Sequence, residues 1–318
     1  MSEKAIYDIV IVGLGPAAAT AALYSYRNNF KTLLVGESFG GATLVSGDIE
    51  NWPGIISTNG FEMAEKMEEQ LKKYCTDETC LKRSLVKSIA KNGELFSVID
   101  KDGTEYVSKA VIYATGGEPR KLNIPGEQEY RNHGVTYCAT CDGPLYRGKD
   151  VIIVGGGNSA LKSAHMMKNI AKSVVVVTIN PEFMGEQISI KQLEKAEKED
   201  EKVRTIKNGK TIEIKGDDKF VKSVVIEHLD SKEREEINVQ GVFVEIGLRP
   251  ITEPVKDLGL EMNTVGEIVA DREMKTNIPG FFVAGDVSDL RDKQIIVASG
   301  TGCIAALSAS DYIAKLGA

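Results

Sequence analysis

Two stretches of this 318-residue chain repeat one order of apolar and polar positions. Residues 7–12 form an apolar run that ends at a glycine-rich turn, and an alanine-rich segment follows to about residue 29. Residues 151–154 form a second apolar run that also ends at glycines. A short apolar run bounded by glycine is typical of a buried strand, and a longer periodic segment is typical of a helix. The pattern therefore predicts two strand-turn-helix units.

The two turns have the same glycine spacing. Gly13, Gly15 and Ala18 follow the first predicted strand as G-x-G-x-x-A, and residues 155–160 repeat this spacing after the second. The first glycine permits a tight turn, the second lets the backbone approach a pyrophosphate, and the third position must be small for helix and strand to pack. The helix N-terminus then binds the anion. One copy alone would also fit plain packing, but two copies indicate two nucleotide-binding units.

Two acids stand where such a unit binds a nucleotide. Glu37 follows the predicted strand 32–35, near the distance at which a carboxylate binds an adenosine ribose, and otherwise it is a solvated loop acid. Asp286 ends the apolar run that begins near residue 277. It is either a ligand of the ribityl chain of a flavin or a helix cap.

The cysteines indicate redox chemistry. There are five, an odd number, and only Cys138 and Cys141 have C-x-x-C spacing. Two thiols that open a helix at this spacing lie on one face, and the helix dipole lowers a thiol pKa toward neutrality. We expect Cys75, Cys80 and Cys303 to be packing or incidental residues. The three histidines are scattered, so the sequence predicts no metal site.

Composition limits the classes of function. The hydrophobic content of 42% suits two domains of ordinary size, and the net charge of -7 argues against nucleic acid. We find no apolar run of the roughly 18 residues that a membrane helix needs, and the N-terminus enters a strand without a signal-peptide core. We therefore expect a cytoplasmic protein.

Motifs along the whole chain make it similar to the low-molecular-weight thioredoxin reductase family. They appear in that family's order: Gly13 to Ala18, Glu50-Asn-Trp-Pro-Gly54, Ala114-Thr-Gly116, Cys138-Ala-Thr-Cys-Asp142, Gly155 to Ala160, Val283-Ala-Gly-Asp286 and Gly302-Cys-Ile-Ala-Ala-Leu307.

The resemblance implies an α/β fold with two nucleotide-binding, Rossmann-like domains, the second inserted into the first. Residues 1–117 and 245–318 would form a discontinuous FAD-binding domain, and residues 118–244 would form the C-x-x-C domain, which resembles an NAD(P)H domain. The linkers 116–119 and 246–250 are rich in the Gly and Pro of domain joints, and in the family they act as a swivel. The family also implies a homodimer.

Site residues follow from the same resemblance. It implies FAD contacts at Gly13, Gly15, Pro16, Ala17, Glu37, Asn51, Thr115, Gly116, Gly285, Asp286, Gln294 and Ile295. Cys138 would form the mixed disulfide with thioredoxin, and Cys141 would face the flavin ring. Asp142 would donate and accept the proton of the outgoing thiolate.

The second nucleotide turn departs from the family. Members that use NADPH follow the next strand with a His-Arg-Arg-x-x-x-Arg run, whose arginines bind the 2'-phosphate. This chain has residues 178–184 there, without arginine and with Glu182. Each charge-assisted hydrogen bond contributes about 1.5 to 3 kcal/mol, so losing two weakens NADPH by roughly two to four orders of magnitude. No acid stands at Thr178 to favour NADH. The second turn is then either a remnant of the fold or a real nucleotide site.

One branch of the family without these arginines takes electrons from ferredoxin, and this sequence resembles that ferredoxin-dependent flavin thioredoxin reductase. A plant-type ferredoxin near -400 mV would reduce thioredoxin near -270 mV downhill by roughly 6 kcal/mol. Residues 118–244 contain 20 basic and 20 acidic residues, so an acidic ferredoxin would dock there more readily than on the acidic FAD domain. The candidate contacts are Lys162, Lys168, Lys172, Lys202, Arg204 and Lys207.

Three alternatives stay open. An NADPH-dependent reductase would bind its nucleotide through other residues. A dithiol oxidase would run the same flavin and cysteines in reverse toward O2. A redox sensor would bind FAD without turnover.

Overall fold

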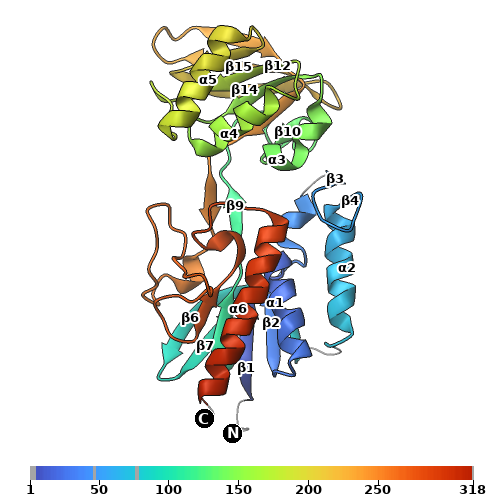
Figure 1. Cartoon of the computed structure of the whole chain (residues 1–318), viewed down its shortest axis with the longest axis vertical. Helices are drawn as coiled ribbons and strands as arrows, with labels where there is room; N and C mark the ends of the chain where they lie inside the picture. The colour runs from blue at the N-terminus through green and yellow to red at the C-terminus, as the bar shows by residue number, and fades with distance from the viewer. Residues whose placement is uncertain (1–4, 46–47, 76–78, 317–318) are drawn as a thin grey trace. The chain divides into compact units, whose positions relative to one another are not determined.

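The computed structural model describes residues 5–45, 48–75 and 79–316. The chain divides into two compact units, Met1–Glu118 with Arg249–Ala318, and Pro119–Leu248, drawn in Figure 1. The second crossing lies beyond the expected boundary at residue 244. Glu245 donates its N–H to the Val154 carbonyl at 2.7 Å, which ties this segment to the second unit.

The first unit is built on a seven-stranded sheet of order β5-β2-β1-β8-β7-β6, with β19 also paired to β8. β5, β2, β1, β8 and β19 run parallel, and β6 and β7 extend the sheet antiparallel. The strands are β1 (Ile6–Val12), β2 (Thr32–Gly36), β5 (Leu81–Arg83), β6 (Val86–Asn92), β7 (Leu95–Asp100), β8 (Glu105–Tyr113) and β19 (Phe281–Val283).

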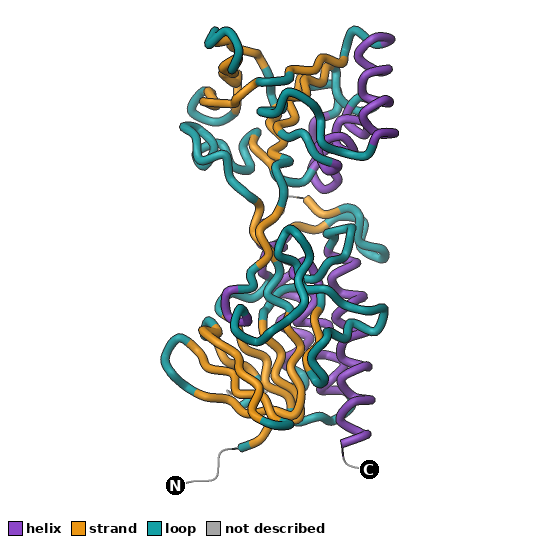
Figure 2. The backbone as a smooth tube through the Cα atoms, turned by 90° about the vertical axis from the view of Figure 1, so that its left-hand side faces the viewer, coloured by secondary structure: helices purple, strands orange, loops and turns teal. Residues whose placement is uncertain are grey.

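Both faces of this sheet are buried. Along β1, Ile9 and Ile11 pack into one core cluster, and Val10 and Val12 pack into another on the opposite face. The first cluster contains residues of α1 (Pro16–Arg27), α2 (Gly60–Lys72) and α6 (Ile295–Leu316). Figure 2 shows these helices in purple beside the orange strands of the sheet. The continuous apolar strands predicted at residues 7–12 therefore reflect burial on two sides.

Helix α6 differs from the sequence expectation about membrane segments. By length and composition it is apolar enough to cross a membrane, with a mean hydropathy of 1.2 over its best window. However, 44% of that window is buried, and a Cβ at Gly302 would lie only 2.1 Å from the Ala17 carbonyl oxygen. The helix is apolar because it packs closely against α1.

The second unit has a parallel sheet of order β10-β17-β11-β12-β13. α4 and α5 pack on one face, and the antiparallel sheet β14-β15-β16 packs on the other (Figure 1). The strands are β10 (Val135–Thr136), β11 (Asp150–Val154), β12 (Ser173–Val177), β13 (Val203–Ile206), β14 (Gly209–Gly216), β15 (Val221–His228), β16 (Arg234–Asn238) and β17 (Gly241–Val244), and the helices are α3 (Ala139–Asp142), α4 (Asn158–Met167) and α5 (Gln187–Glu199). The predicted α/β class with two Rossmann-like sheets is confirmed.

Short elements complete the chain. β9 (Gly117–Pro119) pairs with β18 (Leu248–Pro250), so the two predicted linkers form a two-stranded ribbon. The others are β3 (Asp48–Ile49), β4 (Thr58–Asn59), η1 (Gly41–Val45), η2 (Gly143–Tyr146), η3 (Glu253–Val255) and η4 (Gly285–Val287).

The expectation that Cys75 and Cys80 are incidental was wrong. They form a disulfide with a Cα–Cα distance of 5.6 Å, whereas Cys303 is a free, partly buried thiol. The bond joins the segment after α2 to the segment before β5, and the Cys80 carbonyl accepts N–H of Leu34 at 2.8 Å. Because only tertiary folding sets this pairing geometry, the cysteine spacing alone did not indicate it.

Replacing both cysteines, as Cys75→Ser with Cys80→Ser, is expected to destabilise the first unit by about 2 kcal/mol, because a short covalent loop is released in the unfolded chain. Denaturant unfolding followed by far-ultraviolet circular dichroism measures the loss. Cys303→Ser is the control and should unfold like the parent protein. Equal midpoints for the double variant and this control would contradict a stabilising role.

Candidate functional site

The first glycine turn has one closed side and one open side. Gly13 has φ +121°, and a Cβ there would lie 2.2 Å from the Ala114 carbonyl oxygen, so only glycine fits. Gly15 is the N-cap of α1 in extended conformation, and no side chain caps the helix. A Cβ at Gly15 would meet only the Gly40 carbonyl oxygen, at 4.0 Å. The free space at Gly15 lies where the helix presents its first N–H groups.

Two glycine-containing segments converge on this helix start. Gly40 donates its N–H to the Leu14 carbonyl at 2.7 Å, and a Cβ at Gly41 would lie 3.2 Å from the Gly15 Cα. Gly285 has φ +73°, and a Cβ there would lie 3.0 Å from the Ala17 Cβ. Pro16, at the first position of α1, completes the group. The structure thus brings Gly13, Gly15, Pro16, Ala17 and Gly285 together, as the sequence motifs predicted.

The sequence interpretation missed Thr43. Its side chain is 2% exposed, and its hydroxyl has no hydrogen-bond partner among the residues that the structure describes. It lies in η1, directly after the glycines that pack on the Gly15 turn. A buried hydroxyl without a partner is costly unless a ligand satisfies it. The adjacent Gly40 and Gly41 were the available signal.

Asp286 lies in η4 at the end of β19, next to the α1 start. Burial raises the pKa of its carboxyl group, and the nearby Lys293 ammonium opposes this shift. Lys293 donates to the main-chain carbonyls of Asp286 at 3.1 Å and Ser288 at 2.6 Å, and forms an ion pair with Glu267 at 2.9 Å. Lys293, which the sequence interpretation also missed, therefore holds the loop that carries Asp286.

Asn51 and Gln294 meet although they are far apart in sequence. The Asn51 side-chain amide donates to the Gln294 Oε1 at 3.3 Å, and Ile295 is the first residue of α6. This hydrogen bond places two polar side chains at the N-terminal end of α6.

Thr115, Gly116 and Glu37 are the remaining predicted FAD contacts. Thr115 donates its hydroxyl to the Ile251 carbonyl at 2.8 Å, and Gly116, with φ +71°, accepts the Ile251 N–H at 3.1 Å. Both residues hold the start of the linker ribbon. Glu37 follows β2 with its side chain 55% exposed, 3.6 Å from Lys101. These three stay predictions as ligands.

The second glycine turn has the same close approach as the first, but the segment after β12 is hydrogen-bonded to it. A Cβ at Gly155 would lie 2.2 Å from the Glu245 carbonyl oxygen, as at Gly13. The Gly156 carbonyl accepts N–H of Met184 at 2.7 Å, and the Asn158 side chain accepts N–H of Glu186 at 2.7 Å. The segment after β12 is therefore bonded to the turn and to the start of α4.

Charges in that segment differ from the sequence interpretation. Glu182 stands in an ion pair with Lys207 at 2.5 Å, so its charge is balanced. Lys207 follows β13 and also lies over the Phe183 ring. Sequence proximity to β12 could not reveal this neighbour.

Cys138 and Cys141 form a disulfide in the second unit, with Cα atoms 5.3 Å apart. Cys138 is the N-cap of α3, and its Sγ accepts the Cys141 N–H at 3.2 Å. Both cysteines are partly exposed. The Thr136 hydroxyl donates to the Asp142 carboxylate, and burial, with the Asp142 charge, raises the pKa of Tyr146 to about 12.

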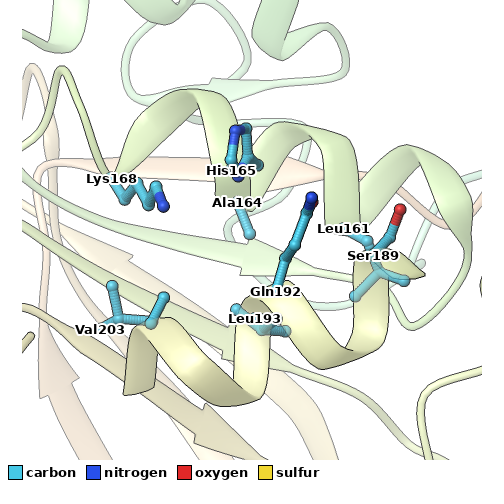
Figure 3. A pocket seen from close by; sticks show the side chains of 9 residues that line it. Leu161, Ala164, His165, Lys168, Ser189, Gln192, Leu193 and Val203 are labelled. Atoms are coloured by element: carbon cyan, nitrogen blue, oxygen red, sulfur yellow. The ribbon is translucent and has the colours of Figure 1, made fainter. Parts of the chain in front are cut away.

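A shallow hollow lies elsewhere in this unit, between α4 and α5. His165, Lys168 and Gln192 project along it above apolar side chains such as Val203 (Figure 3). It contains none of the cysteines or turn glycines, so it is separate from the candidate site.

Comparison with known proteins identifies the family to which this chain belongs. Residues 7–302 match the family described as pyridine nucleotide-disulphide oxidoreductase. This chain belongs to that family. Thioredoxin reductase from Streptococcus pyogenes is 36% identical, with a TM-score of 0.88 over 98% of this chain and 100% of that one. The thioredoxin reductase of Giardia duodenalis is 30% identical, with a TM-score of 0.89 and the same coverage.

Curated relatives are longer than this member of the family. A Bacillus subtilis protein named NADH dehydrogenase is 39% identical over 99% of this chain, and an Escherichia coli protein named as a component of alkyl hydroperoxide reductase is 38% identical over 99%. The chain spans only about 60% of the length of each. The cofactor of this chain is FAD, which this family and the similar thioredoxin reductases bind.

The residues of the first unit fit FAD. The uncapped start of α1 and the open face of Gly15 suit a pyrophosphate. The Thr43 hydroxyl, which has no partner within the described part of the chain, could donate to such an anion. Asp286, buried beside the start of α1, would be the residue to meet a ribityl hydroxyl. These residues would hold and orient FAD, and the chemistry that FAD would supply is the transfer of an electron pair.

Gly15→Val is expected to lower the FAD content of the purified protein at least tenfold, because the new side chain begins on the open face, where a Cβ meets only the Gly40 carbonyl oxygen at 4.0 Å. Flavin absorbance per chain measures it, and circular dichroism verifies the fold. Gly300→Ala is the control, since Gly300 lies exposed in the same unit, needs no positive φ, and a Cβ there meets nothing within 4 Å. A Gly15 variant with normal flavin content would show that the pyrophosphate binds elsewhere.

Proposed function

We propose that this flavoprotein reduces thioredoxin through the Cys138–Cys141 pair. The observation that carries the proposal is the partly exposed disulfide at the start of α3, with Asp142 one helical turn from Cys138. A dithiol in this position can attack a protein disulfide. Similar solved structures named thioredoxin reductases match this chain along its whole length, which favours thioredoxin as the substrate.

The proposed reaction proceeds through a mixed disulfide between Cys138 and thioredoxin. Cys138 attacks the thioredoxin S–S bond as a thiolate, forms a mixed disulfide and releases one thioredoxin thiolate, which takes a proton from Asp142. Cys141 then loses its proton and attacks Cys138, which breaks the mixed disulfide and restores the Cys138–Cys141 disulfide. The second thioredoxin thiolate leaves and takes up that proton. The electron pair that reopens the enzyme disulfide comes from the reduced flavin. The Cys141 N–H at 3.2 Å from the Cys138 Sγ favours a thiolate at Cys138, which supports its role as the attacking sulfur.

Cys141→Ser should trap thioredoxin as a stable mixed disulfide through Cys138, because the resolving thiol is missing. Cys138→Ser should trap at least tenfold less. Non-reducing gel electrophoresis and mass spectrometry of the linked peptides measure the two yields. Cys303→Ser, which retains both active cysteines, is the control and should release thioredoxin normally. The reverse pattern would exchange the two roles, and no adduct with either variant would reject thioredoxin as the substrate.

For the electron donor we propose ferredoxin. The segment 178–184 lacks the arginines that bind a 2'-phosphate. Its Met184 donates N–H to the Gly156 carbonyl, and Glu186, just after it, donates N–H to the Asn158 side chain. Ferredoxin needs only a surface that does not repel acid. Lys172, Arg204 and Lys207 are held by Asp150, Glu235 and Glu182, whereas Lys162, Lys168 and Lys202 form no ion pair with the described residues. These last three are the better docking candidates.

A nicotinamide nucleotide is the second candidate donor. One relative is named NADH dehydrogenase, and a Cβ at Gly157 would meet nothing within 4 Å, so the start of α4 keeps an open side. Lys207, which follows β13, is neutralised by its ion pair with Glu182 and so offers no free charge to a 2'-phosphate. Together with the missing arginines, this favours NADH over NADPH.

Anaerobic mixing with reduced ferredoxin should bleach the flavin and reduce thioredoxin. The rate should fall several-fold between about 50 and about 300 mM salt, because the shorter Debye length screens the docking charges. Millimolar NADPH should give little turnover. Lys168→Glu should slow the ferredoxin reaction, and Lys198→Glu, on the exposed side of α5, is the matched control.

Other outcomes of that experiment identify other functions. Fast bleaching by NADH or NADPH without ferredoxin would reject the proposed donor. Rapid oxygen consumption with a small dithiol would indicate a dithiol oxidase. A flavin that no donor bleaches would indicate a sensor.

We further propose a cytoplasmic homodimer. The exposed side of α6 carries Ile296, Ile304 and Leu307. Tyr24 of α1 is also exposed, and it lies near Cys303 of α6. Contiguous exposed apolar side chains favour a protein interface, and a second copy of the chain is the occupant that the family resemblance implies. Sedimentation equilibrium of the purified protein measures the oligomeric state directly.

A further inference from the structure

Glu245 lies beside the dithiol, and no motif had singled it out. It directly follows β17, and its N–H donates to the Val154 carbonyl at 2.7 Å. Its main chain is also what closes the second glycine turn, since a Cβ at Gly155 would lie 2.2 Å from its carbonyl oxygen. Ala114 occupies the matching position opposite Gly13 in the first unit. An acid therefore stands where the other unit has a methyl group.

The Glu245 carboxyl group is bonded to the helix that carries the cysteines. Its Oε1 accepts the Ala139 N–H at 3.2 Å and the Ser163 hydroxyl at 2.9 Å. Ala139 is the first residue of α3, directly after Cys138, and is 1% exposed. Ser163 lies on α4 and is 8% exposed. The carboxyl group thus joins α3, α4 and the end of β17 within one unit.

We propose that Glu245 is a positioning residue that shares a proton with the reduced Cys138–Cys141 pair, so that its charge sets the pH at which the Cys138 thiolate forms. This rests on the proposed redox role of the pair. Opening the S–S bond with two electrons from the reduced flavin and two protons gives two thiols. When Cys138 then ionises, its proton goes either to solvent or to the Glu245 carboxylate.

Electrostatics favour the shared proton. Burial raises the pKa of Glu245, and the hydrogen bonds from Ser163 and Ala139 only partly offset this shift. The oxidised pair carries no charge, whereas a thiolate adds a negative charge next to the carboxylate. Like charges in a partly buried site cannot both form freely, so the two groups titrate as a pair.

Other titratable groups lie on the elements packed around Glu245. α3 carries Cys141 and Asp142, and α4 carries Lys162 and His165. The Asp142 carboxylate accepts the Thr136 hydroxyl, whereas the Glu245 carboxyl group accepts the Ala139 N–H and the Ser163 hydroxyl. The two acids therefore differ in role: Asp142 serves the proton of the outgoing substrate thiolate, and Glu245 serves the charge of the enzyme's own thiol.

Glu245→Gln tests this, because the amide keeps an oxygen acceptor for Ala139 and Ser163 but removes the charge. The variant is made with Cys141→Ser, so that Cys138 stays a single thiol. Iodoacetamide alkylation of the Cys138 peptide is followed by mass spectrometry as a function of pH, in FAD-loaded protein treated with a phosphine. We expect the pH midpoint to fall by about one unit, which raises the rate about tenfold well below the midpoint.

Two further variants complete the test. Ser163→Ala removes one hydrogen bond that favours the carboxylate, so Glu245 holds its proton to higher pH and the Cys138 midpoint should fall by a smaller amount. Glu201→Gln changes an exposed carboxylate of the same unit and should leave the profile unchanged.

The outcomes separate this inference from the proposed function. Profiles of Glu245→Gln and the parent that superimpose would overturn the proposal and leave Glu245 a purely structural acceptor. If Glu245→Gln does not fold, an unchanged Ser163→Ala profile overturns it equally. The measurement uses neither thioredoxin nor an electron donor, so failure to reduce thioredoxin would reject the function and leave this result standing.

Discussion

Both units depend on one close approach, between the glycine that directly follows β1 or β11 and the carbonyl that directly follows the neighbouring strand, β8 or β17. A Cβ at Gly13 or at Gly155 would lie 2.2 Å from that carbonyl, at Ala114 or Glu245 respectively. No side chain fits such a gap, so the turn requires glycine in both places. Because the turn is tight, the following helix starts directly at the carboxyl edge of the sheet, where parallel α/β sheets place their ligands. The uncapped start of α1, the Thr43 hydroxyl and Asp286 all gather at that edge.

The same constraint has different consequences in the two units because different segments cover the turn. Around Gly15 the covering segment is glycine-rich, and it leaves the helix start open and one hydroxyl without a partner among the described residues. In the second unit the segment after β12 donates Met184 N–H to Gly156 and Glu186 N–H to Asn158. These hydrogen bonds engage acceptor oxygens of the turn and of the start of α4, whereas a phosphate binds N–H donors. They therefore fix the segment after β12 against the second turn, which has no counterpart, in the described part of the chain, of the glycine-rich segment at Gly15.

Local pattern was sufficient to predict the elements whose residues are close in sequence. The apolar strands, the two glycine turns and the C-x-x-C helix each occupy one short segment, so periodicity and spacing reveal them. Thr43, Lys293 and Glu245 act through residues brought close only by folding. Lys293, for example, matters because it reaches the main chain of Asp286 and Ser288 while it pairs with Glu267. The Cys75–Cys80 disulfide was missed for a similar reason: whether two nearby cysteines pair depends on the geometry that tertiary contacts impose.

Two acids near the dithiol, Asp142 and Glu245, also differ in ways that only the folded structure reveals. Asp142 is the last residue of α3, and Glu245 accepts the N–H of its first residue. The sequence positions of the two acids do not reveal this difference. Their partners separate them: Asp142 lies one turn along α3 with the Thr136 hydroxyl, whereas Glu245 reaches from β17 to the N–H that follows Cys138. A carboxylate at that N–H opposes a neighbouring thiolate, and a neutral acid there does not. A disulfide needs no nearby charge, but the dithiol needs a proton acceptor when it becomes a nucleophile. Glu245 therefore connects the tight second glycine turn, which its carbonyl closes, to the N–H that directly follows Cys138.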